Sequence, residues 1–341
     1  MTFFKNLMQK IGGNAADNAD KQALAELTVW VNRYTRSRDG ALSSEQLLSL
    51  TELEVGGDDS LTEIPPAIGQ LRQLKKLAID KCQLTHLPDT IGQLSQLEVL
   101  KVADTPLSAL PDALFSLSQL KHLTIGRTDL TEIPPQIGQL TQLEILNLWS
   151  GRFTQLPEAL AQCQQLKVLR TFGSDIQCLP DNLGQLTQLE NLELSHSQLQ
   201  CLPDSIGELK ALKRLDLSQC KNLAQLPNSI SELSALEVLR LDSTSIDTLP
   251  DSIGQLTQLR ILSLEATGLS ALSPGLVELK NLKRLNLLKC KITELPEAMG
   301  DLRELKINTK RVKTALPNLV SEPLHQFFDI PLTPVTEVPL Y

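Results

Sequence analysis

Six cysteines and four histidines are the residues of this sequence best suited to nucleophilic, redox or metal chemistry. No two cysteines form a C-x-x-C pair and the histidines are scattered, which argues against a zinc site. The sequence also lacks the G-x-S-x-G, H-E-x-x-H and Walker-type phosphate-loop motifs of hydrolases, metalloproteases and nucleotide-binding proteins. We therefore expect no enzymatic activity, no metal and no cofactor.

Composition and charge exclude further classes of function. The 341 residues carry a net charge of −8, whereas binding to nucleic-acid phosphates needs a basic face. No run approaches the ~20 apolar residues of a membrane span. The first residues hold no apolar stretch long enough for a secretory signal. We expect a cytoplasmic protein that binds no nucleic acid and does not span a membrane, with secretion by a route that needs no cleaved signal peptide as the alternative.

A repeat with a step of 23 residues, and at two places of 24, organises most of the chain. Leu-Pro or Ile-Pro recurs from Ile64-Pro65 to Leu295-Pro296, and a second leucine series runs with the same step from Leu74 to Leu282. Leu50 stands one step earlier, which gives eleven copies. Such a period predicts stacked units that bury one another's apolar residues, so residues 50–301 form one repeat domain.

Each copy combines a strand pattern with a proline that begins a short helix. In the copy that starts at Leu189, Leu192 and Leu194 alternate with polar residues, as in a half-buried strand. Pro203 suits the first helical position because its ring fixes φ and its nitrogen donates no hydrogen bond. An acidic residue often follows the proline, where the helix dipole stabilises it. This explains the acidic excess without a substrate: Asp89, Asp112, Glu158, Asp181, Asp204, Asp251 and Glu297.

The consensus L-x-x-L-x-[LIV]-x-x-x-x-[LIF]-x-x-[LI]-P-x-x-[ILM]-G-x-L-x-x resembles the leucine-rich-repeat family over about residues 50–300. This version looks like Ras-group leucine-rich-repeat scaffolds and some bacterial leucine-rich-repeat effectors. The resemblance implies an α/β fold, the right-handed β-α superhelix or horseshoe solenoid, with a parallel sheet lining the concave face and short helices or 3₁₀ turns outside. The family's ladder position, usually Asn, holds accepted substitutes and one glycine here: Cys82, Thr105, Thr128, Gly151, Ser174, Ser197, Cys220, Thr244, Thr267 and Cys290.

Alignment of the repeats divides most of the cysteines into two groups. Cys82, Cys220 and Cys290 occupy the ladder position and are expected to be buried structural thiols. Cys178 and Cys201 are 23 residues apart, which places them on adjacent rungs, close to disulfide reach. We expect this pair to be reduced, because the chain is expected in the cytoplasm and parallel side chains on adjacent strands point the same way.

Both ends of a repeat domain need to cover the exposed core. Residues 1–19 are expected to be a mobile segment and residues 20–49 a helical N-terminal cap. Ser43 with Gln46 predicts a capping box for a second helix in this cap. Residues 302–341 contain five prolines and are expected to form a C-terminal cap and tail, with a free docking peptide as the alternative. The cap's first helix presents one apolar face: Ala23, Leu24, Leu27, Trp30, Val31 and Tyr34.

The strand residues that point away from the leucine core are available to meet another molecule, and family members bind partners on this face. Trp149 and Phe172 hold the same position on adjacent copies and are expected to be exposed, which is typical of a binding hot spot. The alternative is that they pack with each other or are covered by the tail. The candidate partner-binding residues near the aromatic pair are Ile145, Asn147, Val168 and Arg170.

A second group of candidates follows along the repeats and alternates in sign: Glu193, Arg214, Asp216, Arg240, Asp242 and Glu265. These residues form either a rim that orients a charged partner or a solvated face with internal salt bridges. The leading hypothesis is a monomeric, non-enzymatic protein that binds a partner protein as an adaptor or scaffold. The alternatives are a secreted bacterial effector that uses the same face on a host protein, and a small-molecule or glycan sensor, which a shallow face makes less suitable.

Overall fold

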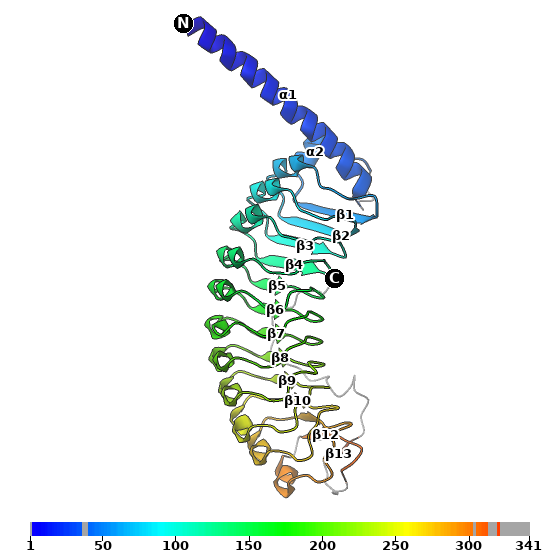
Figure 1. Ribbon diagram of the computed structural model, residues 1–341, viewed down its shortest axis with the longest axis vertical. Helices are drawn as coiled ribbons and strands as arrows, with labels where there is room; N and C mark the ends of the chain where they lie inside the picture. Colours follow the sequence, from blue (N-terminus) through cyan, green and yellow to red (C-terminus); the bar gives the residue numbers. More distant parts are fainter. Residues whose placement is uncertain (1, 36–39, 303–304, 313–318, 321–341) are drawn as a thin grey trace. The chain divides into compact units, whose positions relative to one another are not determined.

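The computed structural model describes the backbone of residues 2–35, 40–302, 305–312 and 319–320, and the side chains of those from 18 to 312 except 300 and 301. The chain divides into two compact units, Met1–Asp129 and Leu130–Tyr341. Each unit contains consecutive parallel strands with short 3₁₀ helices between them (Figure 1).

Unit 1 contains the helical cap and the first four strands. Strand β1 pairs with β2, β2 with β3 and β3 with β4, all in parallel and in chain order. The elements are α1 (Thr2–Tyr34), α2 (Ser44–Leu48), β1 (Glu52–Asp58), η1 (Pro66–Gln70), β2 (Lys76–Cys82), η2 (Asp89–Gln93), β3 (Val99–Ala103), η3 (Asp112–Ser116) and β4 (His122–Gly126).

The cap confirms the predicted helix signals. Ser43 Oγ accepts a hydrogen bond from the Gln46 amide at 3.3 Å, and Gln46 Oε1 accepts one from the Ser43 amide at 2.9 Å, so the capping box closes. Leu27 and Val31 on the predicted apolar face of α1 have no exposed surface. The predicted boundary at residue 19 is not a structural break, because α1 is one helix from Thr2 to Tyr34. Its backbone hydrogen bonds are made within the helix, so it can continue past its packed face.

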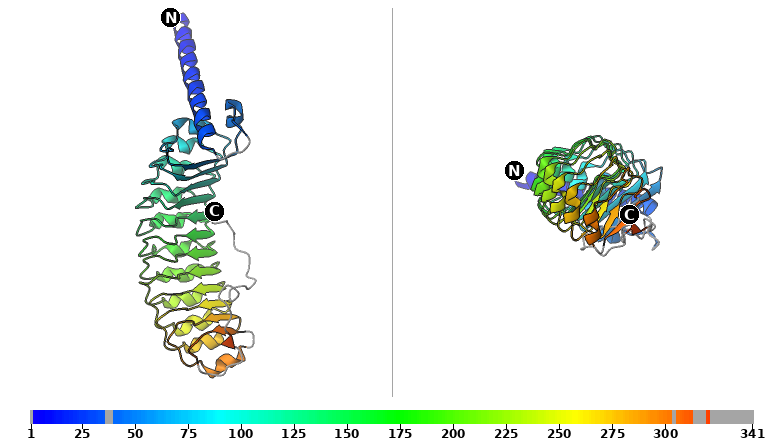
Figure 2. Two further views of the ribbon diagram at one scale, coloured as in Figure 1. Left: turned by 90° about the vertical axis from the view of Figure 1, so that its right-hand side faces the viewer. Right: turned by 90° about the horizontal axis from the view of Figure 1, so that it is seen from below.

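Unit 2 continues the same alternation. Its strands are β5 (Ile145–Asn147), β6 (Val168–Arg170), β7 (Asn191–Glu193), β8 (Arg214–Asp216), β9 (Val238–Arg240), β10 (Ile261–Ser263), β11 (Arg284–Asn286), β12 (Lys306–Asn308) and β13 (Leu319–Val320). The 3₁₀ helices are η4 (Pro135–Gln139), η5 (Glu158–Gln162), η6 (Leu183–Gln185), η7 (Asp204–Glu208), η8 (Asn228–Glu232), η9 (Asp251–Gln255), η10 (Pro274–Glu278) and η11 (Glu297–Asp301). Within the unit each strand lies parallel to the next, and the 3₁₀ helices line one side of the stack (Figure 2).

The repeat core is built from the leucines that recur with the 23-residue step. In the copy that begins at Leu189, that residue, Leu192, Leu194 and Leu199 have no exposed surface. Each leucine packs on its counterparts in the neighbouring copies, since adjacent strands lie about 4.8 Å apart. The predicted fold class, a solenoid of parallel strands that follows a helical N-terminal cap, is confirmed.

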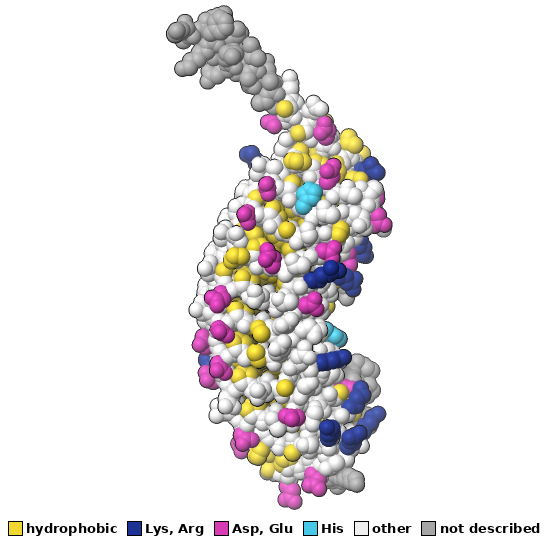
Figure 3. Space-filling view, in the orientation of Figure 1, with side chains coloured by type: hydrophobic (Ala, Val, Ile, Leu, Met, Phe, Trp, Pro, Cys, Tyr) yellow, Lys and Arg dark blue, Asp and Glu magenta, His cyan; other side chains and the backbone are white. Residues whose placement is uncertain are grey.

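The repeat proline sits one position earlier than predicted. Pro203 is the N-cap of η7 with extended backbone angles, φ −68° and ψ 152°, and Asp204 takes the first helical position. Proline fits there because its fixed φ suits extended backbone as well as helix. The acidic residues predicted at helix starts do lie in the first turn of η2, η3, η5, η7, η9 and η11, whereas Asp181 precedes η6. Figure 3 shows acidic side chains along the side of unit 2 that carries these helices.

A residue with left-handed backbone angles stands at the same position of ten consecutive copies, inside β2 in the first of them and just after the strand in the others. These residues are Lys81, Asp104, Arg127, Ser150, Gly173, His196, Gln219, Ser243, Ala266 and Lys289. Only one of them is glycine, so composition gave no signal for this turn. The turn directs the next residue, at the ladder position, into the core.

The ladder residues are buried, and several donate hydrogen bonds to backbone carbonyls. Thr244 Oγ1 donates to Leu241 O at 2.8 Å, and Cys290 Sγ donates to Leu264 O at 3.0 Å. Cys82, Cys220 and Cys290 are at most 2% exposed, so the prediction of structural thiols is confirmed.

We expect Cys220→Ala to lower the free energy of unfolding by about 1–2 kcal/mol and Cys220→Ser to lower it less. Cys220 Sγ donates to Leu194 O at 3.2 Å and lies 3.3 Å from Ser197 Oγ, and a serine hydroxyl can still donate where alanine cannot. Urea unfolding of the three proteins measures the difference. A serine variant less stable than the alanine variant would contradict this, because burial of the hydroxyl would then cost more than its hydrogen bond returns.

The C-terminal segment is described only in part. Strand β12 pairs with β11, and β13 pairs with β12, so the parallel series continues past the last complete repeat. The predicted C-terminal cap and tail span residues 302–341, of which residues 313–341 lie outside the described residues apart from the backbone of Leu319–Val320. The alternative of a docking peptide falls on the same residues.

Candidate functional site

The strand register of unit 2 aligns all the candidate residues on one face of the sheet, which we call the strand face. Ile145 pairs with Val168, and Asn147 with Arg170. The intervening Leu146 and Leu169 point into the core and have no exposed surface, so their neighbours point the other way. The remaining candidates follow in register on β7 to β10 or in the loops after them: Glu193, Arg214, Asp216, Arg240, Asp242 and Glu265.

The N-terminal part of the strand face is less exposed than expected. Ile145 and Val168 have no exposed surface, Asn147 is 5% exposed and Arg170 is 7% exposed. The expectation of solvent-exposed side chains is therefore wrong for these four. Sequence periodicity defines the face of a sheet on which a side chain lies, but not what packs around it there.

The two aromatic residues of the strand face stack on each other. The ring centroids of Trp149 and Phe172 lie 5.9 Å apart with an angle of 3° between the planes, and both side chains are half-buried. The backbone holds them in place, because the Leu148 amide donates to Arg170 O at 2.7 Å and the Ser150 amide donates to Phe172 O at 2.9 Å. The expected juxtaposition is confirmed, and the rings are not buried among the core leucines.

Ion pairs within the strand face link the second group of candidates. Arg170 Nε lies 3.1 Å from Glu193 Oε2, and Asn191 Nδ2 donates to Glu193 Oε1 at 3.1 Å. Farther along, Arg240 Nη1 lies 3.6 Å from Asp216 Oδ2. Two of the six alternating charges thus pair with each other, and Glu193 pairs with Arg170 of the aromatic group. This favours the interpretation of internal salt bridges for these residues.

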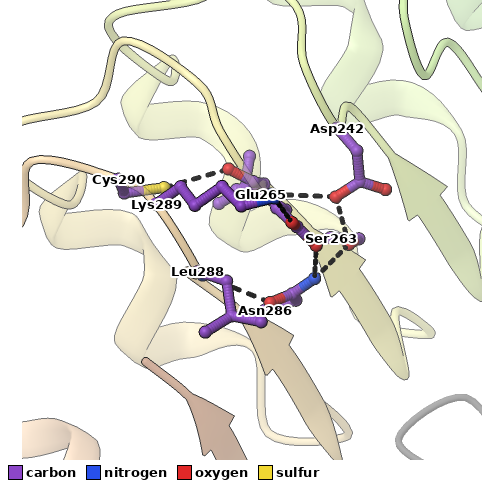
Figure 4. A network of polar contacts seen from close by, with 8 residues as sticks. Asp242, Ser263, Glu265, Asn286, Leu288, Lys289 and Cys290 are labelled. Atoms are coloured by element: carbon purple, nitrogen blue, oxygen red, sulfur yellow. Dashed lines mark hydrogen bonds and ion pairs between the residues drawn. The ribbon is translucent and has the colours of Figure 1, made fainter. Parts of the chain in front are cut away.

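The C-terminal part of the strand face carries a hydrogen-bonded network (Figure 4). Asp242 Oδ1 accepts hydrogen bonds from Ser263 Oγ and, at 2.8 Å, from the Glu265 amide. Asn286 Nδ2 donates to Ser263 Oγ at 3.1 Å, and Lys289 Nζ donates to Glu265 Oε1 at 2.7 Å. Networks of this kind hold polar side chains in one arrangement. The charges are visible in the sequence, whereas these bonds are not.

Burial raises the pKa of Asp242 above its ordinary value of 3.8, and the nearby Asp216 and Glu265 carboxylates add to this effect. Hydrogen bonds from Ser263 and the Glu265 amide oppose it by stabilising the charged form. In the folded protein the carboxyl therefore takes up its proton at a higher pH than in the unfolded chain. Its protonation stabilises the fold as pH falls through the folded pKa, and this contribution is lost as pH rises.

We expect Asp242→Asn to leave the free energy of unfolding at about pH 7 unchanged or higher by up to about 1 kcal/mol. Asparagine keeps an oxygen that accepts from Ser263 Oγ and the Glu265 amide, and it removes the buried charge. Urea unfolding at about pH 7 and about pH 5 tests this, since the part of the pH dependence due to Asp242 should disappear. If the variant were less stable than the parent by more than about 1 kcal/mol at neutral pH, the negative charge itself would be stabilising.

The four buried cysteines of the described region have structural surroundings. Burial raises the pKa of the Cys163 thiol to about 12 and also raises the pKa values of Cys82, Cys220 and Cys290. Thiols of this kind stay protonated near neutral pH and react slowly. Within the described residues no three His, Cys, Asp or Glu side chains gather as metal ligands would. Nor does any helix described here combine the length and apolar character needed to cross a membrane.

Comparison with protein families gives two matches. A model described as a leucine-rich repeat region matches residues 111–217 and 177–259, and a leucine rich repeat model matches residues 72–130. A search of curated proteins found no match.

Several solved structures are similar to the chain. The leucine-rich-repeat domain of the type III effector XCV3220 (XopL) is 28% identical with a TM-score of 0.59, and the match covers 73% of this chain and 91% of that one. The ectodomain of the plant receptor kinase GASSHO1/SCHENGEN3 from Arabidopsis thaliana, solved in complex with CASPARIAN STRIP INTEGRITY FACTOR 2, is 28% identical with a TM-score of 0.64. That match covers 78% of this chain but only 34% of the receptor ectodomain. The internalin InlF from Listeria monocytogenes, 20% identical over 87% of this chain and 93% of its own with a TM-score of 0.61, shares the fold.

Proposed function

Because the chain belongs to the leucine-rich-repeat family, whose fold generally mediates protein–protein interactions, we propose that it is a non-enzymatic module that binds a partner protein on the strand face of β5 to β10. The observation that carries this proposal is the Trp149–Phe172 stack, which lies on that face and not in the core. Stacked aromatic rings that keep part of their surface exposed give a partner a rigid apolar anchor.

The surroundings of the stack support the same proposal. Arg170 and Glu193 form an ion pair beside the aromatic rings, and the network around Asp242 and Glu265 continues the polar surface along the repeats. Preformed side chains lose little conformational entropy when a partner binds, which favours affinity. In this arrangement the aromatic pair is the anchor, and the charged residues set the orientation of the partner and the association rate.

An affinity capture with three proteins tests the proposal. Wild type, the double variant Trp149→Ala/Phe172→Ala and the control Ser195→Ala are immobilised and exposed to the same lysate. Ser195 holds the equivalent position on the next copy, so its substitution alters the same row without removing an aromatic ring. A protein retained by wild type and by the control, but lost with the double variant, supports the proposal. Equal recovery on all three would place the binding surface elsewhere.

A secreted bacterial effector that uses the strand face on a host protein is the second candidate. The similarity to the repeat domain of a type III effector favours this candidate. The cytoplasmic adaptor is supported only by the sequence, whose first residues hold no apolar stretch long enough for a secretory signal. Fusion of residues 1–20 to a reporter, assayed for export through a type III system, separates the two. Export supports the effector, and retention inside the cell supports the adaptor.

A further inference from the structure

Two of the six cysteines differ from the others in being exposed. Cys178 and Cys201 lie on the surface of unit 2, whereas Cys82, Cys163, Cys220 and Cys290 are buried. The exposed pair occupies the loop between the ladder position and the repeat proline, two residues before Pro180 and Pro203. The same position holds glutamine on both flanking copies, Gln155 and Gln225, so the thiols are confined to two adjacent rungs.

Backbone hydrogen bonds hold these two loops side by side. The Gln200 amide donates to Gln177 O at 3.0 Å, and the Gln177 amide donates to Thr154 O at 2.9 Å. Cys178 also forms a parallel bridge with Gln155 of the preceding copy. Adjacent parallel rungs stand about 4.8 Å apart, which is within the range of Cα separations that disulfides span. The two exposed thiols therefore stand on adjacent rungs of one surface.

We propose that Cys178 and Cys201 form an oxidisable dithiol site that a low-molecular-weight disulfide converts into a disulfide between adjacent repeats. One thiolate attacks a sulfur of the small disulfide and expels one thiol, which leaves a mixed disulfide on the protein. The second protein thiolate then attacks the protein sulfur of that mixed disulfide and expels the other thiol. In sum, two protein thiols and one small disulfide give one protein disulfide and two small thiols.

The neighbourhood of the pair favours the second step. Because the two loops are held together by the repeat ladder, the second thiol reacts as an intramolecular group at high effective concentration.

Partial burial raises the pKa of Cys201, and the adjacent Cys178 and the Asp181 carboxylate raise it further. The thiolate is therefore scarce near neutral pH, and oxidation should accelerate as the pH becomes mildly alkaline.

The bond would join the copies that contain β6 and β7. These copies also carry Phe172, Arg170 and Glu193 of the strand face, so the disulfide would fix the spacing between the aromatic anchor and its neighbouring charges.

Mass spectrometry of the full-length protein tests the proposal. The reduced protein is incubated with glutathione disulfide at mildly alkaline pH, alkylated without unfolding and digested. We expect the intact mass to fall by two hydrogens, with a linked peptide pair that contains Cys178 and Cys201. Cys178→Ser and Cys201→Ser should each stop at the mixed disulfide and gain one glutathione. Dithiothreitol should return each protein to its starting mass.

A matched variant tests the geometry of the rung. Gln155→Cys in the Cys201→Ser background moves the dithiol one copy toward the N-terminus, onto the bridge between residues 155 and 178, and should regain the internal bond. The proposal is overturned if the wild-type protein carries two glutathiones, or if both of its exposed thiols are still alkylated after oxidation. The proposal for the native pair is also overturned if the Gln155→Cys variant forms the internal disulfide while the wild-type protein forms none.

Discussion

Trp149→Ala and Phe172→Ala should each weaken partner binding by about 30-fold or more, which corresponds to about 2 kcal/mol. Each substitution removes one ring of the stack, in which the planes differ by only 3°, together with the apolar surface that the ring presents on the strand face. The remaining ring also loses its support. Calorimetry or surface plasmon resonance with the captured partner measures the change.

The two losses should not add, because the rings touch each other and side chains in contact are energetically coupled. The double variant should therefore lose less than the sum of the single losses. Ser195→Ala, on the next copy, should bind as wild type does. All variants should keep their melting temperatures within a few degrees, because the rings contribute little to the leucine core. Full affinity in both single variants, or unfolding of both, would remove Trp149 and Phe172 from the binding site.

Leu192→Ala should lower the free energy of unfolding by about 2–5 kcal/mol. Leu192 has no exposed surface and lies in β7 between Leu169 of β6 and Leu215 of β8. Its removal leaves a cavity that borders both neighbouring copies. Because each repeat is stabilised mainly by its neighbours, a defect in the middle of unit 2 weakens two interfaces at once. Urea unfolding followed by circular dichroism measures the shift.

Leu288→Ala is the matched control for this substitution. Leu288 is the same residue type in the same unit, but it is half-exposed on the strand face beside the Asn286 side chain. Its loss should cost less than about 1 kcal/mol, because little apolar surface returns to water. If Leu288→Ala proved more destabilising than Leu192→Ala, the assignment of core and strand faces would be reversed.

The candidate site was only partly predictable from the sequence. The period of the repeat placed Trp149 and Phe172 at one position on adjacent copies, and the structure brings their rings together. The burial of Ile145 and Val168 was not predicted. The alternation of apolar and polar residues shows on which face of the sheet a side chain lies, but not which neighbouring side chains cover it there. The paired charges, such as Arg170 with Glu193, were visible as opposite signs. Which charge pairs with which depends on side-chain directions that no spacing reveals.

The sequence by itself determined the repeat architecture, the leucine core, the buried ladder thiols and the capping box at Ser43, because each follows from local chemistry or a fixed step between identical neighbours. Only the tertiary structure decided the left-handed turns such as that at Ser150, the N-cap place of Pro203 and the bonds around Asp242. The bonds around Asp242, for example, join copies 21 and 23 residues apart in sequence. The geometry of such bonds depends on which side chains meet once the repeats are stacked. The burial of a repeat leucine, in contrast, requires only that its copy is stacked between two others.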